Sequence, residues 1–266
     1  TIMMKKIFFL TLIMIFEFLG TSFKIQGKYD LPIIKNKAFQ RGEKLTYNLH
    51  YGFIDAATAT LSVTNEKVKF SNRETYHVVG VGKTNGITDW IFKVRDRYES
   101  YIDEKALVPW LFIRRVNEGG YIINQDYIFK RFENKVKTEK NNTYHISENM
   151  QDMISAFYQA RTFDFSEIKI GDEFSIDCFM DEEVFPVKII FKGYENIKIE
   201  LGKIRCMKFI PLLQTGRVFK KEDDLSFFIS DDKNHILIKA KADILFGAIE
   251  VELIENQGLI RPLKTV

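Results

Sequence analysis

Cysteine, histidine and proline are scarce in this chain of 266 residues, which has two cysteines, four histidines and five prolines. No CxxC or HxxxH spacing occurs, so we expect no metal site. The glycine patterns that hold phosphates, G-x-x-x-x-G-K-[ST] and G-x-G-x-x-G, are also missing, which argues against nucleotide binding. The sequence therefore predicts no cofactor.

An excess of charge of one sign is also lacking. Lys and Arg number 39 against 36 Asp and Glu, which gives a net charge of +3, and no run of basic residues stands out. We therefore expect no nucleic-acid partner, because such binding rests on clustered positive charge. Hydrophobic residues make up 45% of the chain and charged residues 28%, which excludes a disordered or collagen-like protein.

The N-terminal segment has the pattern of an export signal. Lys5 and Lys6 precede an apolar run from 7 to 16, which Glu17 ends before it reaches the length of a membrane span. We expect residues 1–22 to be a signal peptide, with no lipoprotein anchor because no cysteine follows the run. The alternative is an uncleaved anchor or a buried helix, and membrane contact would then be made only through this leader. The predicted location is the periplasm or cell envelope.

The two cysteines, Cys178 and Cys206, both lie in runs that look like strands. In an exported protein such a pair permits one disulfide, and we expect the two residues to be close, on neighbouring strands. The alternative is two free, buried thiols that pack as small hydrophobic groups.

Alternating polar and apolar residues dominate the chain. In the run 43–51, Leu45, Tyr47, Leu49 and Tyr51 alternate with polar residues, which indicates a half-buried strand. Phe occurs 24 times and Tyr 11 times, which also favours strands. Similar runs predict strands at 57–64, 75–83, 95–103, 108–116, 121–131, 174–180, 184–191, 197–201, 204–210, 225–230, 235–240 and 244–253.

These strands follow one another without the strand–helix alternation of a parallel sheet. The predicted fold is mainly β, with curved antiparallel sheets in an open barrel or a sandwich-like arrangement. We expect a loose lead-in at 23–38, a single domain over 39–254 and a C-terminal tail at 255–266. The domain would hold two sheet halves joined by a helix at about 150–161.

That helix is predicted from an apolar stripe. Met150, Met153, Ile154 and Phe157 follow helical spacing, and Asn149 could cap the first turn. We expect the stripe to be buried against the concave side of the sheet, where the helix would plug or line an apolar cavity.

A second break in the strand pattern lies near Thr88, which could cap a short helical turn that carries Trp90, Ile91 and Phe92. The ligand-binding residues predicted from the two helical segments are Trp90, Phe92, Met153 and Phe157.

Five short segments together resemble a known family. They are FQRGEKLTY at 39–47, DRYESYID at 96–103, DMISAFYQAR at 152–161, GKIRC at 202–206 and ISDDKN at 229–234. Their order and spacing resemble the bacterial envelope family catalogued as domain of unknown function 3108, over about 39–254. The resemblance implies an exported, mostly β protein of Gram-negative bacteria, and it implies no established activity.

Three groups of polar residues are candidates for a catalytic site. The carboxylates Asp89, Asp96, Glu99 and Asp103 could act as acid and base on a glycan, but Arg95 and Arg97 alternate with them, as in a salt-bridged strand. The run 230–235 contains Ser, Asp and His but is typical of a turn. Ser155, Asp152 and His145 lack the G-x-S-x-G context of a nucleophile.

Three functions therefore remain open at this stage. The favoured one is an envelope β protein that binds an apolar or amphipathic ligand such as a lipid. The second is an envelope glycan hydrolase that uses Asp96, Glu99 and Asp103, or Asp231 and Asp232. The third is a structural partner of an outer-membrane assembly, which would bind another envelope protein.

Overall fold

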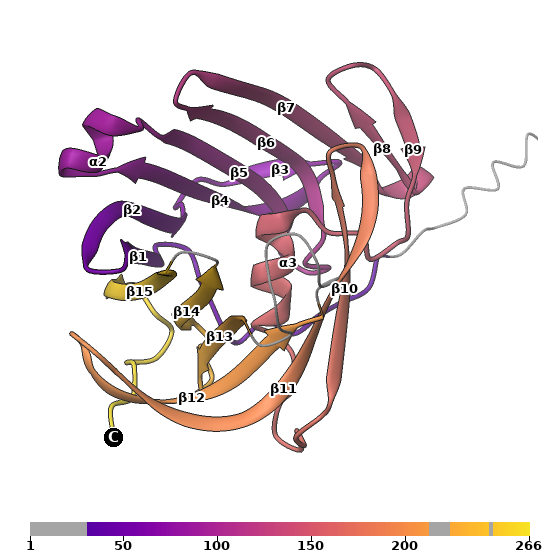
Figure 1. The fold of residues 1–266 in the computed structure, drawn as a ribbon. Helices are drawn as coiled ribbons and strands as arrows, with labels where there is room; N and C mark the ends of the chain where they lie inside the picture. The colour runs from indigo at the N-terminus through magenta and orange to yellow at the C-terminus, as the bar shows by residue number, and fades with distance from the viewer. Residues whose placement is uncertain (1–30, 213–223, 245–246) are drawn as a thin grey trace, which may run out of the picture. The chain divides into compact units, whose positions relative to one another are not determined.

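The computed structural model describes residues 31–212, 224–244 and 247–266. They belong to one compact unit, Leu31–Val266, and the predicted signal peptide lies outside the described residues. Figure 1 shows the strands of this unit curling around a single helix, α3. The elements are β1 (Lys44–Tyr51), β2 (Ile54–Val63), β3 (Val68–Phe70), β4 (Arg73–Thr84), α2 (Gly86–Ile91), β5 (Arg95–Asp103), β6 (Pro109–Glu118), β7 (Tyr121–Lys130), the 3-10 helix η1 (Arg131–Glu133), β8 (Lys135–Thr138), β9 (Thr143–His145), α3 (Met153–Ala160), β10 (Glu173–Met180), β11 (Glu183–Ile199), β12 (Gly202–Pro211), β13 (Leu225–Ser230), β14 (Leu237–Ile244) and β15 (Gly247–Gln257).

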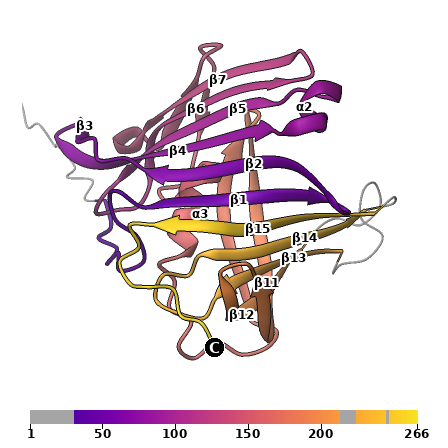
Figure 2. The same ribbon diagram turned by 90° about the vertical axis from the view of Figure 1, so that its left-hand side faces the viewer.

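All the strands belong to one continuous antiparallel sheet. It runs from β10 through β15 to β1 and on to β9, with β3 attached to β4. The first and last strands pair with each other, so β1 lies between β2 and β15 (Figure 2). The prediction of a mainly β, curved antiparallel fold is confirmed, and the two halves of the sheet are joined by the β1–β15 ladder as well as by the helix segment.

The two edges of the sheet lie at β9 and β10. Side chains of β8 and β9 bind the tip of the β10–β11 hairpin, and the segment before α3 forms a short bridge to β10. Glu182, at the tip of the β10–β11 hairpin, accepts hydrogen bonds from Thr138 Oγ1 at 3.1 Å and Tyr144 Oη at 3.0 Å. Gln151, just before α3, forms an isolated parallel bridge with Cys178 of β10. The sheet therefore wraps around α3 without closing into a complete ladder.

Helix α3 begins after Asp152, whose carboxylate accepts hydrogen bonds from the backbone N–H groups of Ile154 and Ser155, both at 2.8 Å. Ser155 Oγ accepts one in return from the N–H of Asp152 at 2.9 Å, which completes a capping box. The predicted cap at Asn149 was wrong, because a carboxylate three residues before a hydroxyl satisfies two free N–H groups at once.

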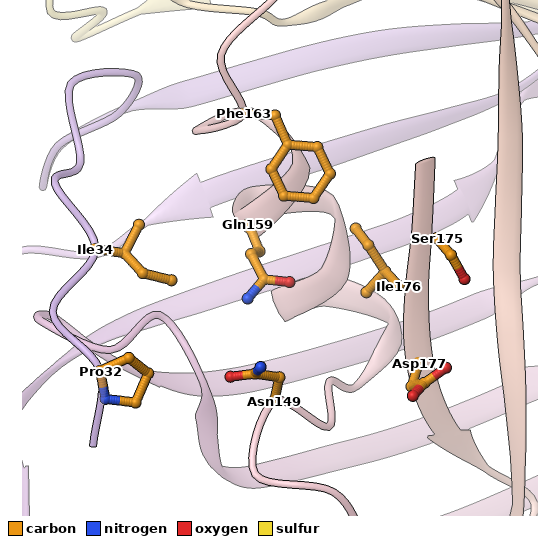
Figure 3. A pocket seen from close by; sticks show the side chains of 8 residues that line it. All are labelled: Pro32, Ile34, Asn149, Gln159, Phe163, Ser175, Ile176 and Asp177. Atoms are coloured by element: carbon orange, nitrogen blue, oxygen red, sulfur yellow. The ribbon is translucent and has the colours of Figure 1, made fainter. Parts of the chain in front are cut away.

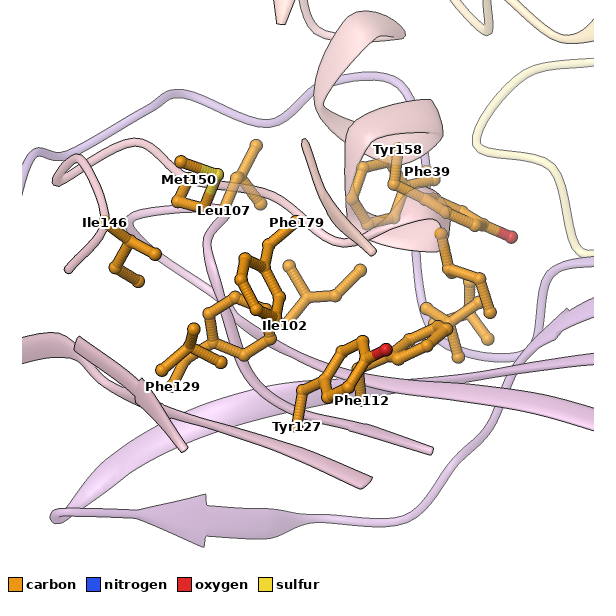
Figure 4. Packing of buried hydrophobic residues seen from close by; sticks show 14 of the residues in the cluster. Phe39, Ile102, Leu107, Phe112, Tyr127, Phe129, Ile146, Met150, Tyr158 and Phe179 are labelled. Carbon is orange, nitrogen blue, oxygen red and sulfur yellow. The ribbon is translucent and has the colours of Figure 1, made fainter. Parts of the chain in front are cut away.

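One side of α3 packs into the main core, which contains aromatic rings from several strands (Figure 4). Tyr158 meets the ring of Phe39 edge-on at 4.7 Å, and Phe179 of β10 meets Tyr127 of β7 edge-on at 5.2 Å. A second core cluster lies under β1, β12 and β15 and includes Leu45, Ile204 and Leu253. Apolar burial on this scale is the main stabilising contribution to such a fold.

Both ends of the described chain are held in place. The lead-in has no regular element at 31–38, but Ala38 is buried and the N–H of Ile34 donates to Lys105 O at 2.7 Å. At the other end, β15 continues to Gln257, and the N–H of Val266 donates to Lys203 O at 2.8 Å. The segment predicted as a tail is therefore partly strand and packs on the domain.

Strand β11 differs from its prediction, because one strand spans the region where two were expected, at 184–191 and 197–201. Its pairing with β12 shifts between Phe191 and Gly193, and Gly193 has a φ of 118°. Such a bulge lets a strand bend and continue, because glycine adopts positive φ without strain.

The two cysteines are free and buried, as the alternative of two packed thiols has it, and the prediction that they lie close together on neighbouring strands is wrong. Cys178 of β10 pairs with Phe185 of β11, whereas Cys206 of β12 pairs with Glu195. The positions 185 and 195 are about 33 Å apart along β11 at about 3.3 Å per residue, while a disulfide needs Cα atoms within about 7 Å. The strands are not neighbours because β11 lies between them. Burial raises the pKa of each thiol to about 12, which makes both unreactive.

Candidate apolar binding site

A cavity of about 440 Å³ lies between α3 and the strands β10 to β14. This volume is in the ordinary range for small-molecule sites. Its lining is almost wholly apolar and comes from the helix, the segment after it and five strands. The lining residues are Met153, Ala156, Phe157, Ala160, Arg161, Phe165, Phe174, Ile176, Cys178, Met180, Phe185, Val187, Ile189, Phe209, Phe227, Ile229, His235 and Leu237.

Among the described residues that line the cavity, Arg161 carries the only charged side chain apart from the titratable His235, and its charge is paired. Its two Nη atoms donate to the carboxylate oxygens of Glu43 at 2.6 and 2.8 Å, and its Nε donates to Asn234 O at 3.0 Å. The side chains of Arg161 and Glu43 are both buried. His235 donates from Nδ1 to Arg161 O at 2.8 Å, and burial lowers the pKa of its imidazole, which favours the neutral form. The cavity therefore presents no free charge to a ligand.

The cavity opens to solvent at a mouth formed by Met153, Phe185 and Val187. These three side chains are 42%, 36% and 38% exposed. Met153 was predicted to be buried with the rest of its stripe, and this was wrong. Met150 and Ile154 are buried as expected, and Phe157 is partly buried, but Met153 begins the helix at the mouth.

Strand β11 supplies one wall of the cavity by simple alternation. Phe185, Val187 and Ile189 line it, while Val184 on the same strand belongs to the opposite face and is 49% exposed. This apolar wall is not covered by other side chains at the mouth, which is unusual for large hydrophobic residues on a soluble surface.

A second hollow, of about 530 Å³, lies where the lead-in meets α3 and β10 (Figure 3). Pro32 and Ile34 face Asn149 and Gln159 across it in the picture. Ser175, Ile176 and Asp177 of β10 and the ring of Phe163 complete the lining. Among its described lining residues, Asp177 is the one acidic or basic side chain and has no second such group beside it, so the apolar cavity is the better candidate site.

The sequence model of a family described as "Protein of unknown function (DUF3108)" matches residues 46–254. This chain belongs to the DUF3108 family. No curated protein matches the sequence.

One solved structure resembles this DUF3108 chain in fold. A β-barrel-like protein of the DUF1849 domain from Brucella abortus aligns with a TM-score of 0.51 at 10% identity, over 86% of this chain and 99% of that chain. Such a distant likeness shows the fold alone. A protein described as a lipoprotein, from Parabacteroides distasonis, aligns with a TM-score of 0.35 at 11% identity, over 86% of this chain and 100% of the other. A protein described as exported, with a YmcC-like fold, from Bacteroides fragilis, aligns with a TM-score of 0.34 at 9% identity, over 85% and 99%.

Of the four predicted ligand-binding residues of this DUF3108 protein, the structure brings two together. Met153 and Phe157 both line the apolar cavity. Trp90 is 87% exposed on α2, which packs against β2 and β4, and Phe92 contacts the turn at Gly119. The two pairs lie on different elements and line no common cavity among those described above.

The predicted cap of α2 was also wrong. The helix begins at Gly86 after Asn85, so Thr88 is inside it. The side chain of Asn85 makes no cap and instead donates to Thr58 Oγ1 at 2.7 Å, which ties α2 to β2.

Three of the four candidate carboxylates, Asp89, Glu99 and Asp103, have a basic partner, whereas Asp96 accepts a hydrogen bond from the backbone N–H of Asn117 at 3.1 Å. Glu99 accepts from His77 Nε2 and Arg97 Nε, both at 2.7 Å, and these bonds lower its pKa although burial opposes them. Asp103 accepts from Arg73 Nη2 at 2.8 Å and Trp110 Nε1 at 3.0 Å, and its pKa is lowered against the effect of burial. A carboxyl group held ionised in this way is poorly suited to act as a general acid.

The remaining polar groups have structural roles. Asp232 accepts from Ser230 Oγ and from the N–H of Asn234, both at 2.9 Å, as in a tight turn, and Asp231 pairs with Arg205 at 3.0 Å. Asp152 and Ser155 are fully buried, whereas His145 is exposed on β9, so they form no triad.

In the part of the chain that the structure describes, no three His, Cys, Asp or Glu side chains gather as metal ligands. No helix there is long and apolar enough to cross a membrane.

Sequence reasoning missed most of the cavity wall. Phe174 and Phe209 were predicted only as members of strands, and Phe165, Arg161 and His235 were not singled out as neighbours of α3. The apolar alternation of Phe185, Val187 and Ile189 was a usable signal, but an inward face of a strand reads the same whether it meets a core or a cavity.

Proposed function

We propose that this protein is exported to the cell envelope and binds an apolar or amphipathic ligand, such as a lipid, in the cavity between α3 and β10–β14. The observation that carries the proposal is a cavity of about 440 Å³ whose lining is apolar and whose mouth exposes Met153, Phe185 and Val187. The N-terminal leader pattern supports the location.

The volume supports a ligand with a long hydrocarbon chain. An apolar cavity of about 150 Å³ binds benzene, which has six carbons, and at the same ratio the cavity here holds about 18 carbons. Each buried CH₂ group contributes about 0.8 kcal/mol, so such a chain would bind without help from polar contacts. A paired Arg161 and a neutral His235 agree with this requirement, because a hydrocarbon that covers an unpaired charge removes its hydration without replacing it.

A matched pair of variants on β11 tests the site. Val187→Trp places a large ring in the cavity mouth, whereas Val184→Trp places the same ring on the opposite face of the same strand. Each purified protein is titrated with a fluorescent fatty acid, and native mass spectrometry reads any lipid that co-purifies. We expect Val187→Trp to weaken fatty-acid binding at least tenfold and to lose co-purified lipid, and Val184→Trp to resemble the wild type.

Equal binding by the two variants would remove the cavity as the site. An absence of fatty-acid binding by the folded wild type, together with an empty mass spectrum, would contradict the proposed function itself. Urea unfolding of each variant confirms that any loss is not a loss of folding.

A further inference from the structure

A second apolar compartment adjoins the main cavity on the far side of two shared residues. It has a volume of about 210 Å³ and is lined by Leu61, Gly80, Tyr98 and Ile154, with Met153 and Phe157. Met153 and Phe157 also line the main cavity. The two compartments therefore lie on either side of the exposed start of α3 and are separated by one thioether and one aromatic ring.

The second compartment exists because one strand position has no side chain. Gly80 of β4 pairs with Leu61 of β2 on one side and with Tyr98 of β5 on the other. A Cβ placed on Gly80 would meet Leu61 Cδ2 at 3.2 Å, Ile154 Cδ1 at 3.8 Å and Tyr98 Cβ at 3.8 Å. Any larger side chain would project into the compartment. Glycine inside a strand is costly unless something approaches it closely.

The backbone at this position does not require glycine. The backbone conformation of Gly80 lies outside the positive φ range that other residues avoid, in contrast to Gly193 on β11. The space above Gly80, rather than its φ angle, is therefore the feature that a larger residue would remove.

We propose that the ligand carries two apolar chains, which separate at Met153 and Phe157 so that one enters each compartment. This inference rests on the proposed function and specifies its ligand class as a two-chain amphiphile. A single straight chain of about 18 carbons already fills the main cavity, so the second compartment accepts a separate, shorter segment of about eight carbons at the same ratio of volume to carbon.

The position of the branch agrees with an amphiphile. Met153 borders both compartments and is 42% exposed, so two chains that part beside it have their common head at the mouth, in contact with water. None of the six described residues that line the second compartment is charged. Methionine suits the dividing position, because its flexible side chain adapts to the chains on either side of it.

The test compares two probes that differ only in the second chain. One is a phosphatidylcholine with a hexadecanoyl and a hexanoyl chain, and the other is the hexadecanoyl lysophosphatidylcholine. Each displaces a fluorescent fatty acid from the wild type and from Gly80→Val. Gly82→Val is the matched control, because Gly82 is on the same face of β4, and a Cβ there meets only Asp96 Cβ, at 3.8 Å.

We expect the wild type to bind the two-chain probe at least about tenfold more tightly than the one-chain probe, since several additional CH₂ groups are buried. Gly80→Val should remove this preference and leave affinity for the one-chain probe within about twofold, while Gly82→Val keeps the preference. Gly80→Ala, a smaller change, should give an intermediate preference, and it serves as the test if Gly80→Val does not fold.

Three outcomes would overturn the inference. They are equal binding of the two probes by the wild type, an unchanged preference in both Gly80 variants, and loss of the preference in Gly82→Val. If the one-chain probe binds and Val187→Trp abolishes that binding, the proposed function stands while the two-chain inference fails. If neither probe binds the wild type, the proposed function fails first.

Discussion

The two sides of α3 have the same kind of residues but different surroundings. On one side, Ile154 and Tyr158 join a core in which rings from β6, β7 and the lead-in are in contact. On the other side, Met153 and Phe157 face a cavity of about 440 Å³. One eight-residue helix therefore stabilises the fold with one face and leaves space with the other.

This difference shows that stability and binding are separated within a single element. The packed side is anchored by the capping box at Asp152. The carboxylate of Asp152 also accepts a 2.6 Å hydrogen bond from Ser100 Oγ, which connects the start of the helix to β5. The far end of α3 is anchored by Arg161, which bonds Glu43 and Ala38 O. With both ends fixed, the cavity side does not need dense packing to hold the helix in place.

The largest effect is expected on the packed side. Phe112→Ala removes a fully buried ring that stacks near Tyr127 at 5.7 Å, and it should lower the free energy of unfolding by about 3–5 kcal/mol. Urea denaturation measures the change. Added fatty acid should not alter the difference from the wild type, and a loss below about 1 kcal/mol would show that this side is not a tight core.

A pH-dependent effect of the next size is expected at the helix cap. Burial raises the pKa of Asp152 from 3.8 to about 6, although Ser100, Ser155 and Ile154 donate hydrogen bonds to it, and Arg131 lies near enough to interact. The folded state therefore holds a proton that the unfolded chain releases between about pH 4 and 6, so this group's contribution to stability falls as the pH rises through that window.

Asp152→Asn removes this titration and keeps the capping oxygen. The difference in unfolding free energy between wild type and variant should change by about 2 kcal/mol between pH 4 and pH 7, with the wild type relatively more stable at pH 4. Urea midpoints at several pH values measure the difference. A constant difference across this range would mean that the carboxyl group has an ordinary pKa.

A smaller effect is expected on the cavity side. Phe157 is partly buried and borders open space, so Phe157→Ala should cost about 1–2 kcal/mol, less than a ring removed from a tight core. Fatty acid should stabilise the wild type more than this variant, because the ring contacts the ligand. A loss of about 3–5 kcal/mol that fatty acid does not affect would indicate a packed core and argue against the binding site.

The smallest effect is expected outside both regions. Trp90→Ala changes a side chain that is 87% exposed on α2, so the free energy of unfolding should stay within about 0.5 kcal/mol. Fatty-acid affinity should also stay the same, because Trp90 does not line the cavity. A clear fall in that affinity would restore Trp90 to the binding site, and fluorescence titration decides between the two.

Much of the fold could be predicted because strand patterns are local. The alternation of Leu45, Tyr47 and Leu49 specifies β1 without knowledge of its partners, and Gly119 and Gly120 mark the β6–β7 turn that the structure contains. The errors occurred where local signals were ambiguous. Asn149 and Asp152 are both good caps, and the structure selects Asp152, which forms a capping box with Ser155 and accepts a buried hydrogen bond from Ser100.

The candidate site was harder to predict, because it depends on contacts between distant segments. Met153 and Phe157 were predicted from an apolar helical segment. The second predicted helical segment gave Trp90 and Phe92, which do not line the cavity. The cysteines were misplaced for a similar reason, since a sequence does not show that β11 lies between β10 and β12.

The sequence by itself determined the antiparallel strands, the helix and its apolar stripe, because each follows from the period of side chains along a chain. Only the tertiary structure decided which stripe residues are buried and which border a cavity. That outcome depends on whether side chains from distant strands fill the space opposite them: Phe39 fills it around Tyr158, whereas Gly80 leaves room in the compartment beside Met153 and Phe157. Packing is a property of the assembled sheet, and no local pattern records it.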